Sequence, residues 1–295
     1  MISFGVLAAI GALVGWGVAD FLLQRISRKN ESVHMLFCSG LVGLFITLPL
    51  AWTHLGTLSS LMSHQWWLIA GICLGIFVNV FFSIEALRSG KLAVISPVFA
   101  LELPLTVILT VLIAHEFPSM IEFLVILLIF AGFFLLTFRG FPHDGKKYMV
   151  KLEKGVLMAL VGVIGLAFYN LTVGLVSRLL YPTVTSFIIN LFMLAFSSIV
   201  LIWRKEFTFP GVFEPLRRQP LQVIATSVLY TGAALCFAYA TTQMPISVAT
   251  GISEGYVALA VLLGLSFGHE RLKRNQYIGV GIVILGIITL AVLAS

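Results

Sequence analysis

Ten apolar runs follow one another along the sequence, separated by short polar connections. Each run is close to the roughly 20 residues that an α-helix needs to cross a bilayer. We expect transmembrane helices over 2–23, 33–52, 66–87, 92–114, 119–138, 155–177, 183–203, 220–241, 246–268 and 276–294. The pattern predicts an all-α integral membrane protein with ten transmembrane helices.

The longest polar connection falls at the middle of the chain and separates five runs from five. We expect a first five-helix repeat over 1–138, a basic cytoplasmic linker over 139–154 and a second five-helix repeat over 155–295. Asp20 matches Asn170 at a shift of 150 residues, and His115-Glu116 matches His269-Glu270 at a shift of 154. Because each repeat has an odd number of helices, the two repeats have opposite orientations. This plan places a central cavity between them.

Composition and charge support the membrane assignment. The chain has 295 residues, 60% hydrophobic and only 10% charged, whereas soluble domains are about 25% charged. All but one of the 18 Lys and Arg residues lie in loops on one side of the predicted helices, and Arg178 is the exception. The net charge of +6 therefore indicates membrane topology and no nucleic-acid partner. The positive-inside rule makes those loops cytoplasmic and places both termini outside.

Glu102 lies in the middle of the fourth run, with Pro97 and Pro104 on either side. A carboxylate at the middle of a membrane costs about 2.5–3.5 kcal/mol on insertion scales. Each proline also removes a helix hydrogen bond that neighbouring groups must replace. Thr106 and Thr110 follow at i+4 and i+8, so they share the face of Glu102. This helix is expected to line a cavity in which Glu102 functions.

The ninth run has the same character. Ser247, Thr250, Gly251 and Glu254 share one helix face, and Gly251 and Gly255 favour a bend. Paired interrupted helices in the two repeats are a sequence indication of a transport site. The two carboxylates are out of register by two residues, since the gapless alignment places Glu102 opposite Tyr256.

Further polar and aromatic residues inside the runs complete the candidate site. Glu85 and Asp20 have alternative interpretations as ion-pair partners of Arg88 and Arg25. The Thr and Ser hydroxyl groups of the fourth and ninth runs have an alternative role in bonding to the preceding helical turn or to a neighbouring helix. The candidate substrate- or proton-binding residues are Glu102, Glu254, Asp20, Asn170, Trp16, Glu85, Tyr239 and Thr250.

No motif in the sequence indicates an enzyme. Residues 251–255 fit the pattern G-x-S-x-G, but that pattern marks a nucleophile only at a strand-to-helix turn with an activating histidine. Here it lies within an apolar run. The sequence has no phosphate-binding loop or zinc motif. Its three cysteines lie within apolar runs without ligand spacing. We expect no catalytic residues, no metal and no cofactor.

The chain resembles the EamA-like family of the drug/metabolite transporter superfamily. The resemblance rests on the five-plus-five duplication, on the run ends Ala114-His115-Glu116-Phe117 and Gly268-His269-Glu270-Arg271, and on the glycine-rich run 278–287. Leu101-Glu102 followed by Pro104 is also similar to the family's Glu-Pro in the fourth helix, with one residue inserted. The resemblance implies a central cavity lined by the third, fourth, eighth and ninth helices and parts of the first and sixth. It also implies efflux or exchange of small metabolites, often driven by protons.

These observations predict a secondary active transporter, an exporter or exchanger, in the inner or plasma membrane of the cell. Because no Lys or Arg lies in the middle of the runs, a neutral, zwitterionic or cationic metabolite is expected. Trp16, Tyr169, Tyr239 and Tyr256 offer rings for a planar or cationic group. The alternative is a lipid flippase without proton coupling. Expected partners are the substrate, protons and membrane lipids, and both a monomer and a homodimer remain open.

Overall fold

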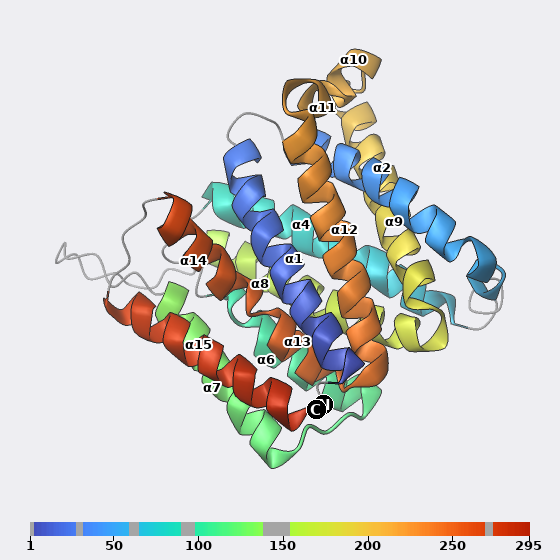
Figure 1. Ribbon diagram of the computed structural model, residues 1–295. Helices are drawn as coiled ribbons and strands as arrows, with labels where there is room; N and C mark the ends of the chain where they lie inside the picture. Colours follow the sequence, from blue (N-terminus) through green and yellow to red (C-terminus); the bar gives the residue numbers. More distant parts are fainter. Residues whose placement is uncertain (1–2, 28–31, 59–64, 90–97, 138–153, 269–273) are drawn as a thin grey trace.

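The computed structural model describes residues 3–27, 32–58, 65–89, 98–137, 154–268 and 274–295 (Figure 1). The first repeat contains α1 (Phe4–Ser27), α2 (Ser32–Ala51), η1 (Trp52–His54), α4 (Trp66–Ser89), α6 (Glu102–Leu109), the π-helical η2 (Thr110–Ala114) and α7 (Met120–Thr137). The second contains α8 (Lys154–Leu179), α9 (Pro182–Trp203), α10 (Phe209–Val212), α11 (Glu214–Arg218), α12 (Pro220–Gln243), α13 (Ile246–Ser253), α14 (Tyr256–Gly268) and α15 (Arg274–Leu293). Apart from Lys154, the expected linker lies outside the described residues, as does His269-Glu270.

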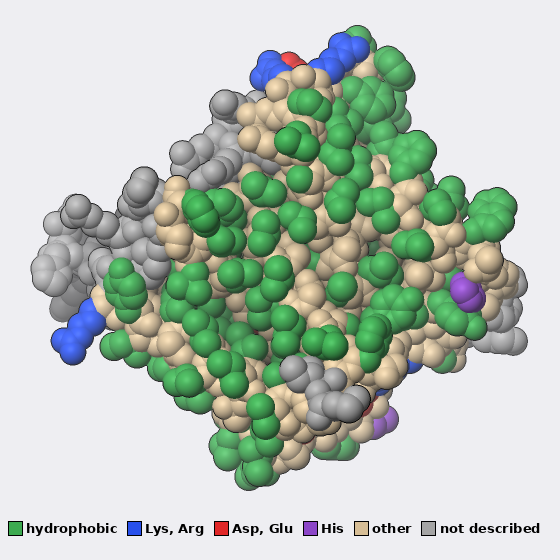
Figure 2. Space-filling view, in the orientation of Figure 1, with side chains coloured by type: hydrophobic (Ala, Val, Ile, Leu, Met, Phe, Trp, Pro, Cys, Tyr) green, Lys and Arg blue, Asp and Glu red, His purple; other side chains and the backbone are tan. Residues whose placement is uncertain are grey.

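The described helices have the length and surface of membrane spans. Eight helices in these ranges are long and apolar enough to cross a membrane, and the stretches Glu102–Ala114 and Met120–Leu136 are shorter apolar helices. Figure 2 shows hydrophobic side chains over most of one face, with Lys and Arg side chains at its edges. The chain is therefore an all-helical, multi-pass membrane protein in its described part. A count of ten spans stays a prediction.

Helix packing follows the predicted inverted repeat. The most extensive contacts join α1 to α12, α4 to α8, α2 to α9 and α7 to α15. In a five-plus-five duplication α1 corresponds to α8 and α4 to α12, so the first two contacts are equivalent. The other two each join a helix to its own counterpart. Such a pattern is what a pseudo-twofold axis between the repeats produces.

Small residues let the equivalent helices approach closely. Gly15 of α1 and Gly165 of α8 correspond at a shift of 150 residues. A β-carbon added at Gly15 would lie 2.8 Å from Cβ of Ala233 in α12, and one added at Gly165 would lie 2.7 Å from Cγ1 of Val78 in α4. In the absence of a hydrophobic effect between helices in lipid, such close contact is a main source of their association.

Two helices are interrupted at corresponding positions. Residues 100–101 form a turn before α6, and residues 254–255 form a turn between α13 and α14. Both positions of the turn correspond at a shift of 154 residues (254 − 100 and 255 − 101). Gly255 lies in close contact with its neighbours, since an added β-carbon would lie 2.2 Å from Cδ1 of Ile287 and would require that side chain to shift. The structure thus confirms the interruption of the ninth run and places a matching turn in the fourth.

Replacing Gly279 with alanine tests the close contact of α15 with α7. The new β-carbon would lie 2.7 Å from both the Gly132 carbonyl oxygen and the Leu136 backbone nitrogen, which cannot move aside like a side chain. We expect Gly279→Ala to destabilise the protein by about 1–3 kcal/mol, measured as a lower thermal unfolding midpoint in detergent. Gly281→Ala is the matched control, because nothing lies within 4 Å of its added β-carbon. Equal midpoints for the two variants would contradict this packing.

Candidate functional site

A cavity of about 530 Å³ lies between the two repeats. Its lining comes from α1, α4, the interrupted fourth run, α7, α8 and the interrupted ninth run. The polar lining residues are Asp20, Asn79, Ser83, Glu102, Glu254 and Tyr256. Three of these six side chains are carboxyl groups, and none of the described lining residues is Lys, Arg or His. The cavity wall is therefore acidic.

Glu102 is held by Asn170, the residue of the second repeat that corresponds to Asp20. It is the first residue of α6, directly after the turn, and only 6% of its surface is exposed. The side-chain amide of Asn170 in α8 donates a hydrogen bond to Glu102 Oε1 at 2.7 Å. The start of a helix also favours a negative charge, because its first backbone N–H groups have no helical partner. These two features stabilise a carboxylate at this position.

Glu254 lies in the turn of the ninth run itself. Its backbone N–H bonds to the Thr250 carbonyl at 2.8 Å, which closes the last turn of α13. Its side chain is 8% exposed and interacts directly with the carboxyl group of Glu102. The two-residue difference in register has a simple origin. The two turns are in register, but one carboxylate lies in its turn and the other lies just after it.

Asp20 is the third carboxyl group of the wall. The hydroxyl of Tyr230 in α12 donates a hydrogen bond to Asp20 Oδ1. Asp20 also lies within electrostatic range of Glu254 and Tyr256. Each repeat therefore brings a polar residue from its first helix to the cavity region, Asp20 from α1 and Asn170 from α8.

The other candidate residues lie away from the cavity lining. Trp16 packs against Phe237 and Tyr256, with ring centroids 5.6 and 6.0 Å apart, and so supports the wall from behind. Tyr239 packs edge-on against Phe4.

Two further candidates have other surroundings. Thr250 is buried in α13, where its hydroxyl bonds to the Ile246 carbonyl at 2.8 Å, as the alternative of bonding to the preceding turn predicted. Glu85 is half-buried near the end of α4 and does not line the cavity. The side chain of its alternative partner, Arg88, is outside the described set.

Sequence reasoning did not identify all of the polar partners. Tyr230 has no distinguishing motif, because its importance comes only from its contact with Asp20, 210 residues away. Ser83 also lines the cavity without a sequence signal, and Phe133 contributes from α7, a helix that was not expected there. The implied lining also included the eighth helix, but α12 supplies none of the described lining residues.

Comparison with known proteins identifies the family. The sequence profile of the EamA-like transporter family matches residues 3–138 and, separately, residues 153–292. The chain belongs to the EamA-like transporter family. The two matches show the EamA two-repeat architecture directly, and they place the chain in a family of membrane transporters.

The fold of this EamA-like protein also occurs among solved structures. One of them, titled only "Crystal structure of protein", has a TM-score of 0.78 and 17% sequence identity, and the match covers 100% of this chain and 98% of that chain. At that identity the likeness concerns the fold alone. No curated protein matches the EamA-like chain in sequence.

Tyr230→Phe tests the support of Asp20. The variant leaves the half-buried Asp20 carboxyl group without its hydroxyl donor, so we expect a loss of about 1–3 kcal/mol in stability. Thermal unfolding in detergent measures it. Tyr169→Phe is the matched control, since the hydroxyl of Tyr169 has no hydrogen bond within the described part of the chain. A Tyr230→Phe midpoint as high as that of the control would contradict the assignment.

Proposed function

We propose that this protein is a secondary active transporter that exchanges protons for small cationic or zwitterionic metabolites. The observation that carries the proposal is the acidic cavity between the repeats, with Asp20, Glu102 and Glu254 on its wall and no basic side chain among its described lining residues. Carboxyl groups inside membrane segments are costly, and they commonly mark substrate or proton pathways. The site of a transporter with inverted repeats also lies near the middle of the membrane.

The charge of the wall favours a cationic group on the substrate. A positive charge in the cavity interacts favourably with three carboxyl groups, whereas a phosphate or carboxylate is repelled by them. Tyr256 and Phe99 line the same cavity and offer aromatic faces to an ammonium group or a planar ring. A neutral metabolite gains no electrostatic attraction from the carboxyl groups of the wall. Cationic and zwitterionic substrates are therefore preferred over neutral ones.

Contact between Glu102 and Glu254 supports proton exchange. Two carboxyl groups that share one site repel each other when both are ionised, so the pair favours binding a proton or a cation. Substrate and proton then compete for the same carboxyl groups. Rocking of one repeat against the other exposes the pair to each side of the membrane in turn.

A ligand-stabilisation screen tests the substrate class. A ligand present at 100 times its Kd stabilises the native state by about 2.7 kcal/mol. We expect organic cations and zwitterions to raise the thermal unfolding midpoint of the purified protein, and sugar phosphates of similar size to leave it unchanged. The stabilisation should be lost in Asp20→Asn. Stabilisation by organic anions alone would contradict the proposed charge selectivity.

Flux into proteoliposomes tests the coupling. With a cation from the screen as substrate, Glu102→Gln and Glu254→Gln should each reduce flux driven by a pH gradient by roughly tenfold or more, because the exchangeable proton is lost. Glu122→Gln is the control, since Glu122 lies outside the cavity lining at the start of α7, where its carboxylate accepts a bond from the Ser119 backbone N–H.

Full proton-coupled flux in both Glu102→Gln and Glu254→Gln would exclude this mechanism. Movement of labelled lipid between leaflets, independent of the pH gradient, would favour the flippase alternative.

A further inference from the structure

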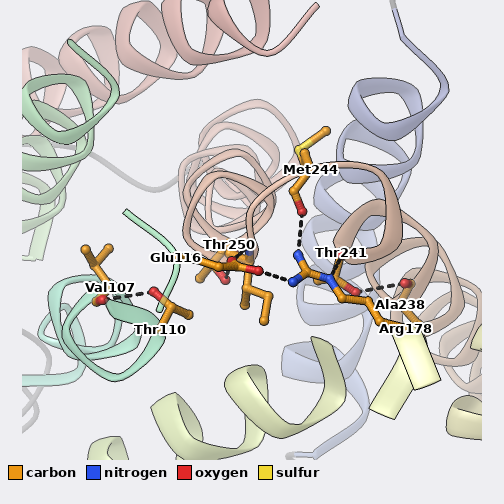
Figure 3. A network of polar contacts seen from close by, with 9 residues as sticks. Val107, Thr110, Glu116, Arg178, Ala238, Thr241, Met244 and Thr250 are labelled. Carbon is orange, nitrogen blue, oxygen red and sulfur yellow. Dashed lines mark hydrogen bonds and ion pairs between the residues drawn. The ribbon is translucent and has the colours of Figure 1, made fainter. Parts of the chain in front are cut away.

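A polar cluster joins the two repeats at the membrane side where the chain begins and ends, called here the terminal side. The termini are adjacent, since the Ser3 hydroxyl lies 3.4 Å from the Ala294 carbonyl oxygen. The terminal cluster consists of the side chains of Glu116 and Arg178, the carbonyl groups of Thr241 and Met244 and the backbone N–H of Ile246 (Figure 3).

All three guanidinium nitrogens of Arg178 make a contact in this cluster. Its Nε donates to the Thr241 carbonyl at 2.6 Å, its Nη2 donates to the Met244 carbonyl at 2.9 Å, and its Nη1 pairs with Glu116 Oε1. The planar shape of arginine suits such forked binding, which a lysine cannot reproduce. Arg178 therefore ties the end of α8 to the end of α12 and to the segment that follows it.

Glu116 connects the first repeat to the same segment. Its second oxygen, Oε2, accepts a hydrogen bond from the Ile246 N–H at 2.8 Å, at the start of α13. The chain enters the cluster through His115, which has a left-handed backbone with φ of 53° and follows the π-helical η2. Glu116 thus caps α13 at one end, while Glu254 lies at its other end. The eight residues of α13 join the terminal cluster to the carboxyl pair.

The cavity does not extend to the terminal cluster. Its lining residues run from the middle of the helices toward the ends that carry the basic loops, with Ser83 in α4 and Gly264 in α14 farthest along. On the terminal side of the carboxyl pair, α6 and α13 pack together with Leu103, Val107 and Ile252 buried. This packed layer separates the cavity from the terminal side.

The packed layer contains hydroxyl groups that have no partner. Glu102, Thr106 and Thr110 share one face of α6 and η2, and Ser247, Thr250 and Glu254 share one face of α13. Because the two glutamates meet, the faces that bear them are turned toward each other. Within the described part of the chain, Thr106 Oγ1 and Ser247 Oγ are buried without a hydrogen bond. Leaving a buried hydroxyl unpaired costs free energy, and water or substrate in an open path would satisfy both groups.

We propose that the layer between α6 and α13 is the closed half of the transport path, and that Glu116 and Arg178 form the gate at its terminal end. This inference rests on the proposed transport function. It adds the place at which the transport path opens to the terminal side. Opening requires the ion pair and the Glu116 cap on α13 to separate. Once these contacts are broken, α13 is free to tilt at the Glu254–Gly255 turn and uncover its hydroxyl face.

Labelling of single cysteines tests the gate without any substrate. In a background with Cys38, Cys73 and Cys236 changed to alanine, Thr106→Cys and Ser247→Cys are the reporters. A charged, membrane-impermeant thiol reagent is applied to proteoliposomes. We expect slow labelling in the parent protein and an increase of about tenfold in rate when Glu116→Gln weakens the cluster by removing its charge pair.

Three controls distinguish gate opening from general loosening. Thr226→Cys reports on a buried, unpaired hydroxyl in α12 outside the path, and its rate should not change. Ser83→Cys reports on the existing cavity, and Glu116→Gln should not accelerate its labelling. Glu214→Gln removes an exposed ion pair with Arg218, whose nearest atoms are 2.5 Å apart, and should leave every rate unchanged.

Unchanged labelling of both path reporters in folded Glu116→Gln protein would overturn the proposal. Arg178→Lys, which keeps the charge and loses the fork, is the second variant if Glu116→Gln does not fold. Failure of both variants to fold would also overturn it, because a gate must open in a folded protein. Full proton-coupled flux in both Glu102→Gln and Glu254→Gln, together with accelerated labelling here, would reject the proposed carboxylate mechanism and retain the gate.

Discussion

Carboxyl groups buried between apolar helices impose the main constraint on this structure. Each must find a donor or a charge partner, because no water in the bilayer core compensates for lost hydration. Asn170 supplies the donor for Glu102 and Tyr230 supplies it for Asp20, so two contacts between different helices depend on these acids. The turns at 100–101 and 254–255 put both glutamates at helix ends, where backbone polar groups are available.

The inverted repeat explains why these groups meet. Equivalent pairs of helices pack through the equivalent Gly15 and Gly165, and the interrupted segments α6 and α13 pack against each other. The two repeats differ in the polar residues that they bring to the cavity region. Asp20 corresponds to Asn170, so one repeat contributes an acid where the other contributes an amide that supports Glu102.

The same short helix connects the acidic cavity with the terminal cluster. α13 is buried along all eight residues, begins at a backbone N–H held by Glu116 and ends at Glu254. Because packed interiors have low compressibility and transmit strain, a shift at one end of this helix is expected at its other end. In the proposed mechanism, this helix is the route by which occupancy of the carboxyl pair would influence closure at the terminal side.

The sequence alone determined the membrane class, the two-repeat organisation and the residues most costly to bury, since hydropathy, duplication and charge are properties of the local sequence. It also indicated the interrupted ninth run through Gly251, Glu254 and Gly255. Only the tertiary structure decided which polar groups meet. Tyr230 reaches Asp20 and Arg178 reaches Glu116 because of helix rotation and the angles at the turns. Trp16, Tyr239 and Thr250 pack outside the cavity lining for the same reason, because a position along a helix does not fix the direction of its side chain relative to other helices.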